Sequence, residues 1–152
     1  MDLAHAHLYL NHFPIIGSII LFILFAYSII KKKENLIRIS LWFFVCIALI
    51  LIPVYFTGDP AEESIINSPG MSEELIEPHE SAALVSLIIM EVIGAASLLT
   101  VLIFKKEKKI PSWLGYSLAV LAIVYLGSVG ITANLGGQIR HPEIRPEKTM
   151  TN

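Results

Sequence analysis

The sequence has little charge, a single cysteine and none of the short motifs that mark common catalytic sites. Only 16% of its 152 residues are charged, whereas 55% are hydrophobic, and the mean hydropathy is +0.68. A soluble domain of this size would need more polar surface to cover itself. Cys46 has no partner for an internal disulfide. There is no glycine-rich phosphate loop, nucleophile elbow or catalytic-triad spacing, so the common nucleotide-binding and hydrolytic sites have no candidate residues.

Four apolar stretches are each long enough to cross a bilayer, which takes about 20 helical residues. Backbone polar groups cannot stay unpaired in hydrocarbon, so we expect each stretch to be a helix. The predicted fold is all-α: one transmembrane domain over residues 1–152, a four-helix bundle that runs up and down in sequence order. A long loop is expected at 57–80. The predicted spans are Leu8–Ile30, Leu36–Phe56, Ser81–Phe104 and Trp113–Leu135.

Positive charge is concentrated in two short loops. KKKENLIR at 31–38 and KKEKK at 105–109 hold eight of the eleven basic residues. By the positive-inside rule, these loops face the cytoplasm, and the N-terminus, the loop at 57–80 and the C-terminus face outward. Because topology accounts for the basic residues, we expect the lipid bilayer as a partner and no nucleic acid.

The outer side carries most of the groups that can do chemistry. Ten of the thirteen acidic residues and all five histidines belong to segments expected there. Spans one and three begin on the outside and spans two and four end there, so separate segments bring these groups to one level. Imidazole and carboxylate groups are ligands for iron, copper and zinc. The candidate metal ligands are His12, His79, His141, Glu63 and Glu80.

Several of these polar residues also have a structural interpretation. DPAE at 59–62 has the form of a capping box with proline at the first helical position, so Glu62 is explained equally well as a helix cap. His5 and His7 are expected to be mobile near the terminus and to bind nothing. The pair Gly136–Gly137 is expected where a helix ends.

Two histidines are expected to share the centre of the bundle. Spans one and three are diagonal partners if the bundle runs in sequence order, and diagonal His12 and His79 can hold one haem iron from both sides. Span four offers a stripe of Gly127, Gly130 and Asn134 at helical spacing. Such stripes support a pocket or mediate close helix packing. On span three, the His79 face runs through Ala83, Ser86, Met90 and Ser97.

Glu91 is an acid eleven residues into the third span, near the middle of the bilayer. A charged carboxylate there costs about 2.5–3.5 kcal/mol on insertion scales. We therefore expect Glu91 to be protonated or paired inside the bundle. Three helical turns place it beneath Glu80 on the same face, which is compatible with half of a proton path. The alternative is a neutral acid hydrogen-bonded to Ser97, Thr100 or Cys46.

Four motifs stand at the outer ends of the predicted spans. They are LNHFP at the start, YFTGDPAEE after span two, PHESAA opening span three and LGGQIRHPEI at the end. Together they resemble a bacterial four-span membrane family of unknown function, over nearly the whole chain. Related transmembrane units are joined to Rieske or c-type cytochrome modules. The resemblance implies redox work with b-type haem, with His12 and His79 at the matching ligand positions and GGQIRH as the motif ending span four.

Three functions remain open from the sequence. The first is electron transfer by b-type haem in a respiratory chain, in which His12 and His79 hold the iron and His141 can replace either. Arg140 would pair with a haem propionate, and respiratory subunits or a periplasmic cytochrome would be partners. The second is the non-haem metal site described above, in an enzyme or a metal-handling protein. The third is a structural or assembly subunit whose polar cluster binds nothing.

Overall fold

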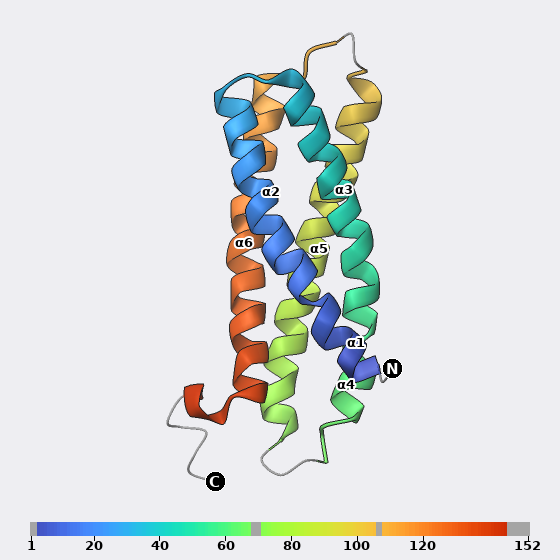
Figure 1. Ribbon diagram of the computed structural model, residues 1–152, viewed down its shortest axis with the longest axis vertical. Helices are drawn as coiled ribbons and strands as arrows, with labels where there is room; N and C mark the ends of the chain where they lie inside the picture. The colour runs from blue at the N-terminus through green and yellow to red at the C-terminus, as the bar shows by residue number, and fades with distance from the viewer. Residues whose placement is uncertain (1–2, 68–70, 106–107, 146–152) are drawn as a thin grey trace.

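The computed structural model describes residues 3–67, 71–105 and 108–145. These residues form helices and connecting turns, without a β-strand in those ranges. Four of the helices are long and apolar enough to cross a membrane, and they run side by side (Figure 1), which confirms the predicted all-α four-helix bundle. The elements are α1 (Leu3–Leu10), α2 (His12–Ile30), α3 (Glu34–Phe56), α4 (Gly58–Glu63), α5 (Glu73–Ile103), α6 (Ser112–Arg140) and the 3-10 turn η1 (Pro142–Ile144).

The helix order around the bundle follows from which helices touch. α2 packs against α3 and α6, and α5 packs against the same two helices. α2 and α5 are therefore diagonal, as predicted for spans one and three. The α2–α3 and α5–α6 connections lie at one end, here called the lysine end, while α1, α4, the start of α5 and the end of α6 gather at the opposite, histidine end (Figure 1).

The outside of the bundle is apolar, as expected for a multi-pass membrane protein. In the most apolar window of each long helix, only 22 to 33% of the residues are buried inside the protein. The exposed side chains include large apolar ones such as Ile20, Trp42 and Val120, which suit contact with lipid rather than water. The segments with the length and hydropathy to cross a membrane are His7–Ile30, Glu34–Glu63, Glu73–Ile103 and Ser112–Arg140.

The core lies along the axis between the four helices. Phe25 of α2 and Phe44 of α3 meet edge to face, with ring centroids 5.2 Å apart. Met90 and Ile93 of α5 are completely buried in the same cluster, together with Tyr125 of α6. Each long helix thus contributes a bulky side chain to one continuous core.

Small hydroxyl residues are buried among these apolar side chains without disturbing the packing. Ser28, Ser40 and Thr100 donate to carbonyl oxygens three or four residues earlier in their own helices, at 2.7, 2.9 and 2.7 Å. Such bonds satisfy the hydroxyl group locally and keep the side chain small at a helix interface.

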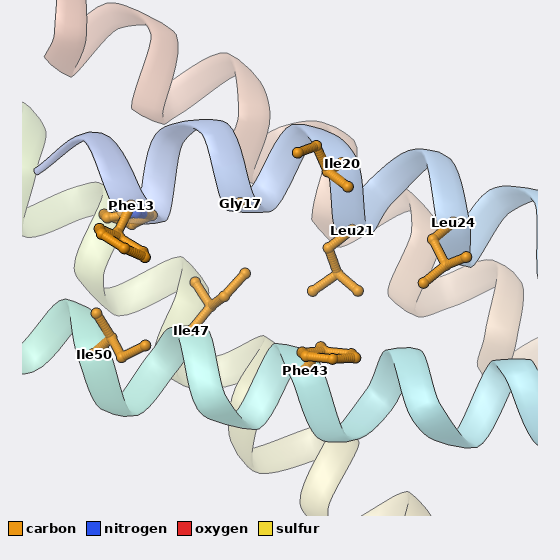
Figure 2. Close-up of a pocket in the computed structure, with 9 residues that line it drawn as sticks. Phe13, Gly17, Ile20, Leu21, Leu24, Phe43, Ile47 and Ile50 are labelled. Carbon is orange, nitrogen blue, oxygen red and sulfur yellow. The ribbon is translucent and has the colours of Figure 1, made fainter.

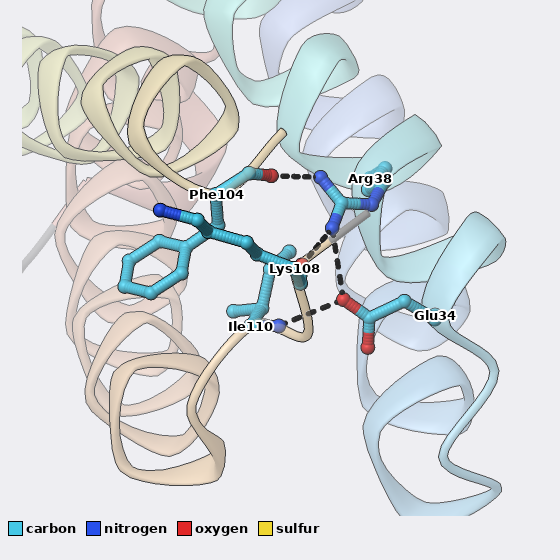
Figure 3. A network of polar contacts seen from close by, with 5 residues as sticks. All are labelled: Glu34, Arg38, Phe104, Lys108 and Ile110. Atoms are coloured by element: carbon cyan, nitrogen blue, oxygen red, sulfur yellow. Dashed lines mark hydrogen bonds and ion pairs between the residues drawn. The ribbon is translucent and has the colours of Figure 1, made fainter. Parts of the chain in front are cut away.

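One polar network holds the lysine end together (Figure 3). The Arg38 guanidinium donates to the carbonyl oxygens of Phe104 and Lys108, and to the Glu34 carboxylate at 3.2 Å. Glu34 also accepts the Ile110 backbone N–H at 2.8 Å. The start of α3 therefore satisfies carbonyl and amide groups that the α5–α6 connection leaves open.

Candidate functional site

The first helical segment is interrupted at Asn11, between α1 and α2. Pro14 has no N–H for the carbonyl of Leu10, four residues earlier, and its ring clashes with that carbonyl. α1 accordingly ends at Leu10, and α2 begins at His12. The Asn11 backbone N–H still bonds to the His7 carbonyl oxygen at 2.9 Å, and α1 packs against α4. This packing brings the N-terminal segment onto the histidine end.

His7 is held by this arrangement rather than loose near the terminus, contrary to our expectation. Its Nδ1 lies 3.1 Å from the Val54 carbonyl oxygen and 3.2 Å from the Thr57 hydroxyl, both at the end of α3. Its Cε1 lies 3.8 Å from where a Cβ on Gly58 would stand. The half-buried ring therefore fits between α1 and the α3–α4 junction.

His79 occupies the corresponding position between α5 and α6. Its Nδ1 lies 3.0 Å from the Thr132 carbonyl oxygen. A Cβ on Gly136 would be 3.0 Å from the His79 Cε1 and 3.2 Å from its Nδ1, which is tighter than ordinary contacts. The glycine pair at 136–137 lies inside α6, which continues to Arg140, so the expectation of a helix end there is wrong. Gly136 provides room for the His79 ring.

Hydroxyl groups below His79 fix the two helices against each other. Ser86 of α5 bonds to the hydroxyls of Ser128 and Thr132 on α6, at 2.7 and 3.0 Å. Thr132 also donates to the Ser128 carbonyl oxygen at 3.1 Å. The predicted inward face of span three is confirmed, because Ser86, Met90 and Ser97 are all buried. This packing sets the position of the carbonyl that orients His79.

Two carboxyl groups also lie at the histidine end of the bundle. Glu62 of α4 and Glu80 of α5 lie near enough for their charges to interact, and Asp59 adds a further negative charge nearby. Carboxylates this close repel, and one shared proton or one cation between them relieves the repulsion. The capping-box interpretation of Glu62 is wrong, because α4 already begins at Gly58 and Thr57, its N-cap, makes no side-chain capping bond.

Both pairs lie at the histidine end of the bundle. His7 lies near enough to His79 for their charges to repel, and Gly58, next to His7, precedes Glu62 by one helical turn. We call His7, Glu62, His79 and Glu80 the histidine-end cluster. In the part of the chain that the structure describes, no three His, Cys, Asp or Glu side chains yet gather closely enough to hold a metal ion.

The predicted partner of His79, His12, lies on an exposed face of α2. Its Nδ1 is 2.9 Å from the Leu8 carbonyl oxygen of the preceding turn. The diagonal placement of the helices therefore does not by itself turn His12 towards the bundle axis. Among the predicted carboxylates, Glu80 joins the cluster, whereas Glu63 is exposed on α4.

The residues that follow α6 form their own contacts. His141 and Arg140 are exposed, and the His141 Nδ1 lies 3.0 Å from a Glu143 carboxylate oxygen. The pKa of the Glu143 carboxyl is held below its ordinary value by its own backbone N–H and then by the His141 ring. The Arg145 guanidinium donates to the Gln138 carbonyl oxygen at 2.8 Å. These contacts cap the end of α6.

Glu91 is half buried, and one of its carboxyl oxygens is enclosed without a hydrogen-bond partner among the residues that the structure describes. Among the described residues, none of the three partners considered for it is hydrogen-bonded to this oxygen. Thr100 donates to its own helix, Cys46 is exposed, and the Ser97 hydroxyl is itself without a partner among the described residues. The structure therefore lacks the hydrogen bond from Glu91 to Ser97, Thr100 or Cys46 that the sequence analysis offered as an alternative.

A cavity of about 330 Å³ lies between α2 and α3, just beyond His12. Figure 2 shows the side chains of Phe13, Ile47 and Ile50 around the gap between the two helices. Its walls are entirely apolar and include neither a histidine nor a carboxylate. The cavity suits hydrocarbon and offers no axial ligand for a haem. It is lined by Phe13, Pro14, Gly17, Ile20, Leu21, Leu24, Phe43, Ile47 and Ile50.

The glycine stripe of span four takes no part in either region. Gly127 and Gly130 are exposed, and a Cβ on either would meet nothing within 4 Å.

Comparison with other proteins adds no relationship, because no family model, curated protein or solved structure matches the chain. The functional argument therefore rests on the geometry of the histidine-end cluster.

Proposed function

We propose that the protein is a membrane-embedded metal-binding protein that holds a transition-metal ion at its histidine end. His7 and His79 are the imidazole ligands, and Glu62 and Glu80, at the same end of the bundle, supply carboxylates. The observation that carries the proposal is the pairing of two half-buried rings, from α1 and α5, whose Nδ1 atoms both face backbone carbonyl oxygens.

This hydrogen bonding determines which ring nitrogen is free. A carbonyl oxygen only accepts, so Nδ1 must carry the hydrogen in both His7 and His79. In a neutral ring, Nε2 then carries the lone pair. Metal-ligating histidines usually donate their other ring N–H in this way, because the bond orients the ring and strengthens the ligand.

The carboxyl pair supplies the charge that a cation requires. Glu62 and Glu80 repel each other when both are ionised, and a cation between the pair and the two rings removes that repulsion. Because no three of the described groups meet at one centre, binding requires the carboxylates to rotate towards the rings. A mixed imidazole and carboxylate set is suited to iron, copper or zinc.

A small ion fits these residues better than a haem. Neither His7 nor His79 lines the cavity between α2 and α3 or the groove between the start of α3 and the end of α5. A copper or iron ion would allow electron transfer in a respiratory membrane, whereas zinc would be structural or hydrolytic. We further propose a bacterial inner-membrane location with the lysine end in the cytoplasm, on the basis of the positive-inside rule.

The test is metal analysis of protein purified in detergent, before and after incubation with copper, iron or zinc. We expect one metal to bind stoichiometrically. His79→Ala and His7→Ala should each weaken binding by more than the roughly 10–100-fold cost of losing an outer-shell contact. His12→Ala is the matched control, because that exposed ring lies outside the cluster and its loss should leave binding unchanged.

Two further measurements separate the alternatives. Circular dichroism of each variant shows whether a loss of metal reflects unfolding of the bundle. A visible spectrum of the wild type tests for haem, since a Soret band that shifts on dithionite reduction would replace the proposal with haem binding. Wild-type protein with neither metal nor haem, or folded His79→Ala that keeps its metal, would overturn it.

A further inference from the structure

A groove lies between the start of α3 and the end of α5, and its walls differ from those of the apolar cavity between α2 and α3. It has a volume of about 560 Å³ and opens to the surface at the lysine end. Its walls combine charged, amide, aromatic and aliphatic side chains. The lining residues are Asn35, Arg38, Ile39, Trp42, Val101 and Lys105.

The polarity of the groove changes with depth along both helices. α3 runs from the α2–α3 connection into the bundle, so Asn35 and Arg38 come first and Trp42 lies about a turn further in. α5 runs the opposite way, so Lys105 lies beyond its end and Val101 about a turn deeper. Polar groups therefore line the mouth, and apolar groups line the part that faces the membrane interior.

The available positive charge in the groove is that of Lys105. Arg38 directs its two terminal nitrogens to the carbonyl oxygens of Phe104 and Lys108 and to Glu34, which also offsets its charge (Figure 3). The Lys105 side chain is exposed and forms no ion pair within the described part of the chain. An anion at the mouth would complement this charge.

We propose that this groove binds an anionic phospholipid of the adjoining leaflet. The lipid phosphate lies against Lys105 at the mouth, and the first part of an acyl chain lies along Ile39, Trp42 and Val101. Basic pockets between transmembrane helices suit anionic headgroups, and tryptophan is favoured at the same depth. A free phosphate ion would leave the apolar depth of the groove empty, which is why the occupant is a lipid.

Trp42 provides a direct reporter, because the chain has only one other tryptophan, Trp113. In Trp113→Phe protein reconstituted into bilayers, Trp42 fluorescence reports quenching by lipids with brominated acyl chains. We expect brominated phosphatidylglycerol to quench it more strongly than brominated phosphatidylcholine at the same low mole fraction. Equal quenching by the two lipids would overturn the proposal.

Two lysine variants separate the groove from general attraction to an anionic surface. Lys105→Gln should reduce the preference for phosphatidylglycerol by about fivefold. Lys31→Gln, which removes an equal charge from an exposed position at the same end and outside the groove, should leave the preference unchanged. Equal losses in both variants would count against the site. Inorganic phosphate should not restore the fluorescence, and full competition by phosphate would rule out a lipid-specific site.

Discussion

Gly94 of α5 packs directly on Ala48 of α3. A Cβ atom at Gly94 would lie 2.5 Å from the Ala48 Cβ, with the Phe44 carbonyl oxygen at 3.8 Å. Ordinary carbon–carbon contacts are about 3.5–4.0 Å. The methyl group added by Gly94→Ala would therefore lie about 1 Å too close to the Ala48 Cβ. Both Cβ atoms are attached directly to helix backbones. Side-chain rotation therefore cannot relieve the overlap, and α3 and α5 must move apart.

We expect Gly94→Ala to lower the free energy of unfolding by about 1–2 kcal/mol. Overpacking a core costs roughly 1–3 kcal/mol, and a contact this short belongs in the upper half of that range. Alanine recovers up to about 1 kcal/mol through its higher helix propensity. Gly130→Ala on α6 is the matched control, since the added Cβ would meet no described atom within 4 Å beyond its own stretch of helix, and only the propensity gain should remain.

The assay is unfolding of purified protein in mixed micelles, followed by loss of helical circular dichroism as a denaturing detergent is added. Combining Gly94→Ala with Ala48→Gly restores the room that the new methyl group needs. The double variant should therefore be more stable than the sum of the single losses by the overpacking term, about 2–3 kcal/mol of coupling. Gly94→Ala that is as stable as Gly130→Ala, or an absence of coupling, would refute the packing argument.

Gly136→Ala should displace the His79 ring and weaken metal binding about tenfold, which is typical when a group that orients a metal ligand is altered. Gly137→Ala should not, since its Cβ would meet only a flexible side-chain end at 3.4 Å; equal affinities measured by metal titration would contradict this. For orientation, single cysteines replacing Lys31 and Glu143 are introduced after the native cysteine is removed. A membrane-impermeant maleimide should label only the cysteine at 143 in intact cells, and the reverse pattern would invert the proposed topology.

The number, class and order of the helices could be predicted because they depend on averages over many residues. Long apolar stretches need helices in lipid, and short connections make successive helices antiparallel neighbours. The diagonal placement of spans one and three followed from these two facts. The inward face through Ser86, Met90 and Ser97 followed from helical spacing and was confirmed by burial.

The composition of the candidate site depended on particular side chains and was predicted only in part. His79 and Glu80 were identified, but His7 was assigned to a mobile terminus, and His12 was expected in its place. Pro14 was the available signal, since it breaks the helix near Leu10 and frees the preceding segment to lie on α4. Sequence alone did not indicate where that segment would pack.

The sequence by itself determined a membrane-spanning bundle with chemistry gathered at one end and positive charge at the other, because hydrophobic length and loop composition are local properties. The tertiary structure alone decided which polar groups meet. His7 reaches the Val54 carbonyl oxygen on a separate helix, and Glu62 of α4 comes near Glu80 of α5. Which side chains come together depends on how each helix is rotated about its axis and on the interruption at Asn11. Each residue turns the helix by about 100°, so the side chain next to one in the cluster can face lipid instead.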